Sequence, residues 1–352
     1  MYSISAADAI SPAIERTKAL LFRPFKWGTF LKLGLVALIT EGLGSNLRSS
    51  SRGGNGPSSG GGPMIHSLSD IPPLWIVGGV AALLLVFVIA AAIYYLITRL
   101  RFAFFHCLVT NTKKIRPGWG LYKEQASRFF WLNIAVGFCF LLLMGLIAIP
   151  FVAGFWRVIH DMPQGGHPDF GMLLGLILPL LPIIFLLVLA GIALDIILRD
   201  WMLPHYALED ASAGEAWSSV WARIKAEKGQ FFAYALLRLI LPTIAGIAIF
   251  MILLIPGLVL AGAVAGLELG IHSAFANSTG SASVAGIMLQ VFFGLVAFGF
   301  FLLASICLGG PLSTGTREYA LLFYGGRYQV LGDLLYPPAL AQGSAPAGLP
   351  AV

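Results

Sequence analysis

Two charged side chains lie inside stretches that are otherwise apolar, and they are the first candidates for chemistry in this chain. Asp195 comes near the end of the run at 171–198, and Arg238 lies about two turns into the run at 232–256. Charged residues within a membrane span often mark a substrate or proton pathway. The alternative is structural: Asp195 can pair with Arg199 at i,i+4, and Arg238 can snorkel to the surface or pair with Asp195 or a lipid phosphate. We favour the structural interpretation.

A second group of residues has the chemistry of a metal site. His106 and Cys107 are adjacent, and with His205 they offer two imidazoles and a thiol, three ligands that suit zinc. Their spacing matches no known zinc pattern, so we interpret the histidines as polar residues at the membrane interface and expect neither a metal nor another cofactor. The sequence contains no HExxH, P-loop, CxxC or nucleophile-elbow motif, and we expect no enzyme activity.

The composition indicates the environment in which these residues work. Of the 352 residues, 58% are hydrophobic and only 11% are charged, and the mean hydropathy is +0.87. A soluble domain has roughly 25% charged residues. The chain is therefore predicted to be an all-α, polytopic integral membrane protein, and its basic pI of about 9.3 indicates a bias of charge across the membrane rather than nucleic-acid binding.

A helix needs roughly 20 apolar residues to cross the hydrocarbon core. Six transmembrane helices are predicted: 28–44, 74–97, 130–154, 171–198, 232–256 and 284–308. The first contains Lys32 and Glu41, which can snorkel to opposite surfaces, and a helix lying on the surface is the alternative. The apolar residues 257–266 either continue the fifth span or form a re-entrant segment.

Basic residues between these spans predict the orientation. Seventeen lie in residues 1–27, 98–129, 199–231 and 309–352, against three in 45–73, 155–170 and 257–283. Because Lys and Arg concentrate on the cytoplasmic side, both termini are expected in the cytoplasm. The segment 98–129 is then a cytoplasmic loop. A Ser- and Gly-rich external loop at 45–72 and a tail at 335–352 are expected to be disordered, beside a single membrane domain at 1–334.

Amphipathic helices are predicted to lie in the membrane interface before spans one, three and five. Their apolar stripes are Ile10, Ala13, Ile14, Thr17 and Leu21; Trp119, Tyr122, Ala126 and Phe129; and Trp217, Val220, Trp221 and Ile224. Ser212 and Glu215 form a capping-box pattern before the third stripe. The candidate lipid-facing residues there are Trp217, Trp221, Arg223, Lys225 and Lys228. Three faint repeats follow, each an interfacial helix and a two-span hairpin, with His106 recurring as His205.

The segment "DWMLPHYALEDASAGEAWSSVWARIKAEKGQFFAY" resembles the membrane domain of bacterial glycerophosphodiester phosphodiesterases and its uncharacterised relatives. The matching positions are Pro204, Glu209, Asp210, Ala216 and Trp217, and "ALLFRPFKWGTFLKLG" also looks like that group. In those enzymes the chemistry resides in a separate barrel domain, and the residues after Gly309 are too few to form one. The resemblance therefore implies a membrane fold without catalytic residues, located in the inner membrane of a bacterium.

Taken together, these patterns predict a non-catalytic membrane scaffold or accessory module. Its expected partners are membrane lipids, anionic ones among them, and a protein that the sequence does not identify. The alternative is a small-molecule or lipid transporter, which is favoured by prolines inside or near spans three to five because prolines permit hinges. These are Pro150, Pro179, Pro182, Pro242 and Pro256.

Overall fold

A computed structural model describes residues 4–42, 73–160, 170–275 and 281–336. The regular elements within these ranges are all helices, two of them short π-helical segments (η1 and η3). In chain order they are α1 (Ile10–Phe22), α2 (Trp27–Ala37), η1 (Leu38–Gly42), α4 (Pro73–Val109), α5 (Arg116–Leu121), α6 (Lys123–His160), α7 (Phe170–Ile196), η3 (Ile197–Met202), α8 (Leu203–Leu208), α9 (Ala213–Ala226), α10 (Lys228–Phe275), α11 (Ser281–Gly325) and α12 (Gln329–Leu335).

Five helices of the described residues are long and apolar enough to cross a membrane. They are α4, α6, α7 with its continuation through η3 and α8, α10 and α11. The expected first span, 28–44, is not among them: α2 and η1 together run only from Trp27 to Gly42, and residues 43 and 44 lie outside the described ranges. The predicted external loop at 45–72 and nearly all of the predicted tail also lie outside them.

The long helices extend well beyond the spans that hydropathy predicted. α4 continues to Val109 and α6 begins at Lys123, so the expected loop at 98–129 is largely helical. α10 continues without a break to Phe275, so residues 257–266 continue the helix of the fifth span and do not form a re-entrant segment. Hydropathy marks only the residues that lipid can cover, whereas a helix continues wherever its backbone hydrogen bonds do.

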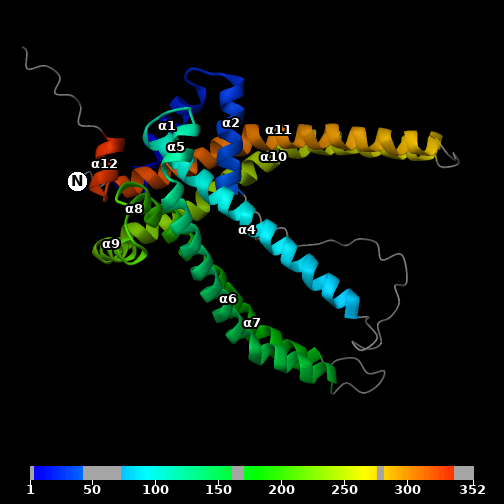
Figure 1. Cartoon of the computed structure of the whole chain (residues 1–352), viewed down its shortest axis with the longest axis horizontal. Helices are drawn as coiled ribbons and strands as arrows, with labels where there is room; N and C mark the ends of the chain where they lie inside the picture. Colours follow the sequence, from blue (N-terminus) through cyan, green and yellow to red (C-terminus); the bar gives the residue numbers. More distant parts are fainter. Residues whose placement is uncertain (1–3, 43–72, 161–169, 276–280, 337–352) are drawn as a thin grey trace, which may run out of the picture.

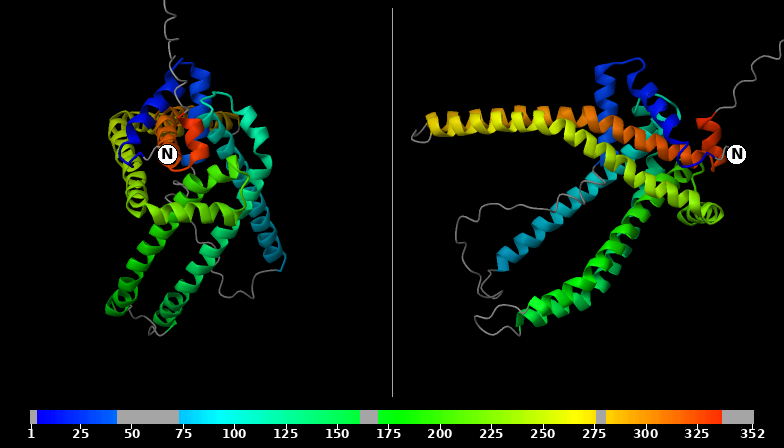
Figure 2. Two further views of the ribbon diagram at one scale, coloured as in Figure 1. Left: turned by 90° about the vertical axis from the view of Figure 1, so that its left-hand side faces the viewer. Right: turned by 180° about the vertical axis from the view of Figure 1, so that it is seen from behind.

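The long helices leave a common centre as three arms (Figure 1). We call the centre the hub: it comprises α1, α2, η1, α5, η3, α8, α9, α12 and the adjoining ends of the long helices. The arms are α4 alone, the α6–α7 hairpin and the α10–α11 hairpin. Figure 2 shows from two further sides that the arms diverge and that the short helices gather at their roots.

The hub has a densely packed aromatic core. The rings of Trp201 and Phe231 meet edge to face at 4.8 Å, and those of Tyr234 and Phe323 stack at 4.3 Å. All four side chains are almost fully buried. Aromatic pairs at these separations add to the stabilisation that burial alone supplies. The hub therefore has the interior of a water-soluble domain, although five membrane-length helices emerge from it.

Two glycines allow α2 to cross α11 in close contact. A β-carbon on Gly310 would lie 2.6 Å from the Cα of Gly34, a separation that no side chain tolerates. α1 packs further along α11, where the Arg16 guanidinium binds the Glu318 carboxylate at 3.1 Å and donates to the Leu108 carbonyl oxygen at 2.9 Å. The N-terminal helices are thus part of the hub.

α1 and α9 divide their predicted apolar stripes between protein and solvent-facing surface. In α1, Ala13, Thr17 and Leu21 are buried and Ile14 is half exposed. In α9, Val220 is buried with its neighbour Ala216, which the prediction did not include. The capping box predicted at the start of α9 is confirmed: the Ser212 hydroxyl accepts from the Glu215 N–H, and the Glu215 carboxylate accepts from the Ser212 N–H.

Candidate functional site

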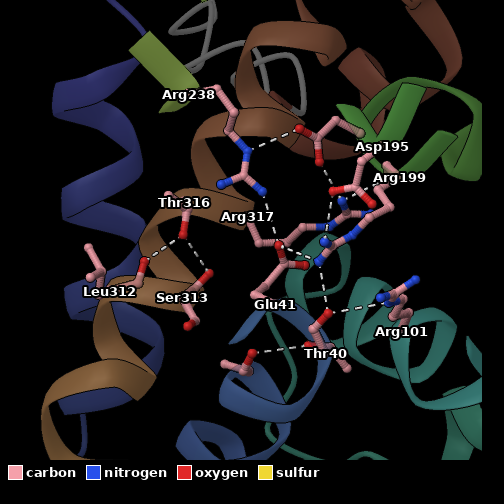
Figure 3. A network of polar contacts seen from close by, with 12 residues as sticks. Thr40, Glu41, Arg101, Asp195, Arg199, Arg238, Leu312, Ser313, Thr316 and Arg317 are labelled. Atoms are coloured by element: carbon pink, nitrogen blue, oxygen red, sulfur yellow. Dashed lines mark hydrogen bonds and ion pairs between the residues drawn. The ribbon is translucent and has the colours of Figure 1, made fainter. Parts of the chain in front are cut away.

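A network of mostly buried charges joins six elements at the point where the arms originate. The arginines come from α4, η3, α10 and α11, and the acids come from η1, α7 and η3. The arginines are Arg101, Arg199, Arg238 and Arg317, and the acids are Glu41, Asp195 and Asp200. Figure 3 shows the arginines converging on η1 from different helices. We call this set the ionic junction.

Glu41 links the N-terminal part of the chain to two arms. Its carboxylate Oε2 lies 2.9 Å from Arg199 Nη2 and 3.0 Å from Arg238 Nη2. The side chain is only 8% exposed, so the interaction is shielded from water. The sequence analysis allowed Glu41 to snorkel to one surface of the membrane, but two guanidinium groups hold it inside the hub instead.

Asp200 is the most deeply buried acid of the junction. Its two carboxylate oxygens accept from Arg238 Nε at 3.0 Å and from Arg317 Nη1 at 2.9 Å. The Tyr234 hydroxyl donates to the same carboxylate at 2.8 Å. Because one buried carboxylate binds two cations and a hydroxyl from α10 and α11, it fixes both helices of that arm to η3.

The π-helical segments offer backbone carbonyl groups to the same arginines. The Thr40 carbonyl oxygen in η1 accepts from Arg199 Nη2 at 2.8 Å and from Arg101 Nε at 3.2 Å. In η3, the Arg199 carbonyl oxygen accepts from Arg317 Nη1 at 2.8 Å. A π-helical turn holds one more residue than an α-helical turn, and such turns are frequent at functional sites.

The ionic junction carries an excess of positive charge. Four guanidinium groups face three carboxylates, and Asp195 is the one acid with a half-exposed side chain. Arg199 Nε and Arg317 Nη2 are buried without a hydrogen-bond partner among the described residues. Burying unbalanced charge is costly. The junction therefore ties helices together and retains one positive charge that the three carboxylates do not balance.

The two charges singled out from the sequence both belong to this network. Asp195 pairs with Arg199 at 3.1 Å, which confirms the ion pair that their i,i+4 spacing predicts. Arg238 has partners within the protein, but the prediction that Asp195 is one of them is wrong. Arg238 binds Glu41 and Asp200 instead. The reason is that η3 turns Asp200 inward towards α10, while Asp195 stays at the edge.

The residues considered for a metal site have separate partners. His205 is buried in the hub rather than exposed at the interface, with Nδ1 2.9 Å from a Glu209 carboxylate oxygen and Nε2 2.7 Å from the Tyr324 hydroxyl. His106 packs against the Tyr122 ring, and the Cys107 thiol donates to the Lys114 carbonyl oxygen at 3.3 Å. Within the described ranges, no three His, Cys, Asp or Glu side chains gather as a metal site would require.

The candidate lipid-facing residues of α9 and its end divide into two groups. Trp217 and Trp221 are 42% and 44% exposed and stack on each other, and Lys225 and Lys228 are exposed beside them. Arg223 was predicted to face lipid, and the structure places it differently. Its guanidinium donates to the Arg327 carbonyl oxygen at 3.2 Å and lies over the Tyr328 ring at 5.2 Å, because this side of α9 packs on the hub.

The sequence analysis counted Arg101 and Arg317 only as evidence for orientation, and it gave Arg199 a role only as the partner of Asp195. A usable signal was present, since each follows a long apolar run by a few residues, in "TRLRF", "ILRDW" and "GTREY". His106 follows Arg101 by five positions and His205 follows Arg199 by six, and the extra residue coincides with η3. If the predicted repeats hold, Arg101, Arg199 and Arg317 occupy corresponding positions at the end of the second span of each repeat.

Five helices of membrane-crossing length that meet in a packed hub define the class: this is the architecture of a multi-pass helical membrane protein. The chain belongs to the family of unknown function DUF7544, which matches residues 4–334. No curated protein matches the chain, and no solved structure matches it.

Proposed function

We propose that the protein is a non-catalytic scaffold or accessory module of the bacterial inner membrane, acting with membrane lipids and a protein partner. The main support for the proposal is that the ionic junction is set apart from the apolar arms. The ionic junction lies in the hub, whereas the arms present large apolar side chains outwards along their length. A transporter encloses a pathway between its spans, but diverging arms leave their faces to lipid.

A cysteine scan of the arms distinguishes a scaffold from a transporter. Cys107, Cys139 and Cys307 are first changed to Ser, and single cysteines are then placed along 178–189 in α7 and 244–255 in α10. A scaffold predicts that none of these positions reacts with a membrane-impermeant thiol reagent in proteoliposomes. Reaction at every third or fourth position would reveal a water-filled pathway and would reject the scaffold.

The second candidate is a small-molecule or lipid transporter. It is favoured by the excess positive charge of the ionic junction and by two π-helical segments there, since irregular helix geometry near buried charge is typical of substrate sites in membranes. Four prolines within α7 and α10 add potential hinges: Pro179, Pro182, Pro242 and Pro256. The same cysteine scan decides between the two functions.

We further propose that both termini are cytoplasmic, that α2 and η1 form part of a sixth span, and that α1 and α9 lie in the membrane interface. The asymmetry of basic residues supports this orientation. Impermeant labelling of intact cells tests it: Arg157→Cys at the end of the α6 arm should react, and Lys123→Cys at its root should not. The similarity to the membrane domain of glycerophosphodiester phosphodiesterases stays a prediction of the sequence.

A further inference from the structure

A basic pocket of about 510 Å³ lies between the start of α2 and the segment that joins α4 to α5. Thr29 and Lys32 line it from α2. Lys113, Lys114 and Arg116 line it from the other side, together with Ile115 and Pro117. The pocket is separate from the ionic junction, and its lining contains four cations and no acid.

One of these cations, Lys113, is held in place by backbone contacts and stabilises one side of the pocket. Lys113 Nζ donates to the carbonyl oxygens of Arg23 and Pro24 at 3.0 Å and 3.1 Å, which ties the α4–α5 segment to the turn before α2. Lys32, Lys114 and Arg116 are exposed and have no ion-pair or side-chain hydrogen-bond partner among the described residues. Three unpaired cations around one concave site suit a phosphate group, which accepts several charge-assisted hydrogen bonds.

An exposed aromatic cluster beside the pocket indicates where that phosphate comes from. Phe22, Phe25 and Trp27 are 44%, 45% and 62% exposed, and the rings of Phe25 and Trp27 meet at 5.2 Å. Trp27 opens α2, two residues before Thr29. Large aromatic side chains that are left exposed beside basic residues are typical of the headgroup level of a membrane.

The adjoining face of α2 suits the tail of a lipid. Leu35 is exposed and follows Lys32 by three residues, so the two side chains share one face of the helix. We propose that this pocket binds the phosphate of an anionic phospholipid, with Lys32, Lys114 and Arg116 on the headgroup and Leu35 beside an acyl chain. This proposal does not depend on the proposed scaffold function, because a transporter could have the same lipid site.

The test measures lipid binding to the full-length protein in detergent by native mass spectrometry. Phosphatidylglycerol is titrated against phosphatidylcholine for the wild type and for the triple variant Lys32→Gln, Lys114→Gln and Arg116→Gln. Each cation near an anionic headgroup is worth about fivefold in affinity, so the variant should bind phosphatidylglycerol at least about tenfold more weakly. Binding of phosphatidylcholine should not change.

A matched control removes the same charge from other exposed positions, with Lys18→Gln, Lys123→Gln and Arg157→Gln. The control should keep its phosphatidylglycerol affinity within about twofold, since those positions do not line the pocket. Equal losses in both triple variants would show a diffuse charge effect and overturn the proposal. A further arm adds inorganic phosphate alone: stabilisation of the wild type equal to that by phosphatidylglycerol would show a soluble ligand and overturn the lipid assignment.

Discussion

The two ends of α11 show how differently the hub and the arms are built. Near its end in the hub, Phe323 is fully buried and Tyr319 is 4% exposed, whereas Phe301 in the arm is 70% exposed. Both regions are apolar, so hydropathy does not separate them. What separates them is that the hub end also contains Arg317 and Glu318, charged residues that find partners on other helices.

The difference arises because the hub is packed against water and the arms are packed against lipid. The hub buries apolar surface away from water, as a soluble domain does. Along the arms, lipid tails are as apolar as leucine, so exposed side chains need no protein partner. The ionic junction lies in the hub at the roots of the arms, where its ion pairs link the long helices to one another. Its removal as a whole need not destabilise the protein, but the loss of one partner leaves a buried charge uncompensated.

The largest expected effect comes from Asp200→Ala, which leaves Arg238 and Arg317 without their shared carboxylate. Removing one partner from a buried ion pair costs about 3–5 kcal/mol. Thermal unfolding of the detergent-solubilised protein, followed by near-UV circular dichroism, should show a large fall in the midpoint. The control is Glu124→Ala at an exposed position, for which a change within about 0.5 kcal/mol is expected. Equal midpoints would mean that the junction does not hold the hub together.

The second effect compares the same substitution in the hub and in an arm. Gly310→Ala should cost about 1–3 kcal/mol, because its β-carbon would collide with the Gly34 backbone at the crossing of α2 and α11. Gly294→Ala in the arm of the same helix meets no atom within 4 Å and should be neutral or stabilising by up to about 1 kcal/mol. The two midpoints should move in opposite directions or differ clearly. Similar shifts in the two unfolding midpoints would mean that the hub and the arm do not differ in how tightly α11 is packed.

The smallest effect concerns the capping box of α9. Hydrogen bonds from the Ser212 N–H and from its hydroxyl lower the pKa of Glu215. This contribution is present above the ordinary glutamate pKa and is lost as the pH falls through the lowered value. Ser212→Ala should destabilise the start of α9 by about 1 kcal/mol, with faster amide exchange in residues 213–217 at neutral pH. The difference from the wild type should shrink in acid, and exchange rates equal at every pH would contradict this role.

The features set by local patterns could be predicted from the sequence. The all-helical class, the Asp195–Arg199 pair and the capping box at Ser212 each depend on residues within one helix. Five predicted spans lie within helices of sufficient length, and these helices continue beyond the predicted spans.

The ionic junction could not be predicted in the same way. It requires η1 to lie against η3 and α10, so that Glu41 meets Arg238 across 197 positions of the chain. A single sequence does not show which distant residues pair. In addition, a basic residue near the end of a span is equally expected if it simply faces lipid headgroups. Arg223 illustrates the same limit, since only the packing of α9 on the hub decides that its guanidinium turns inward.

The most direct test of the account is a double-mutant cycle between Glu41 and Arg238, measured as the free energy of unfolding. The variants are Glu41→Gln, Arg238→Lys and their combination, which keep side-chain size similar. We expect each single variant to be destabilised and the double variant to lose at least about 1 kcal/mol less than their sum, since both substitutions disrupt the same buried interaction. Additivity within about 0.3–0.5 kcal/mol would show that the two residues do not interact, and the ionic junction would then not be what joins the arms to the hub.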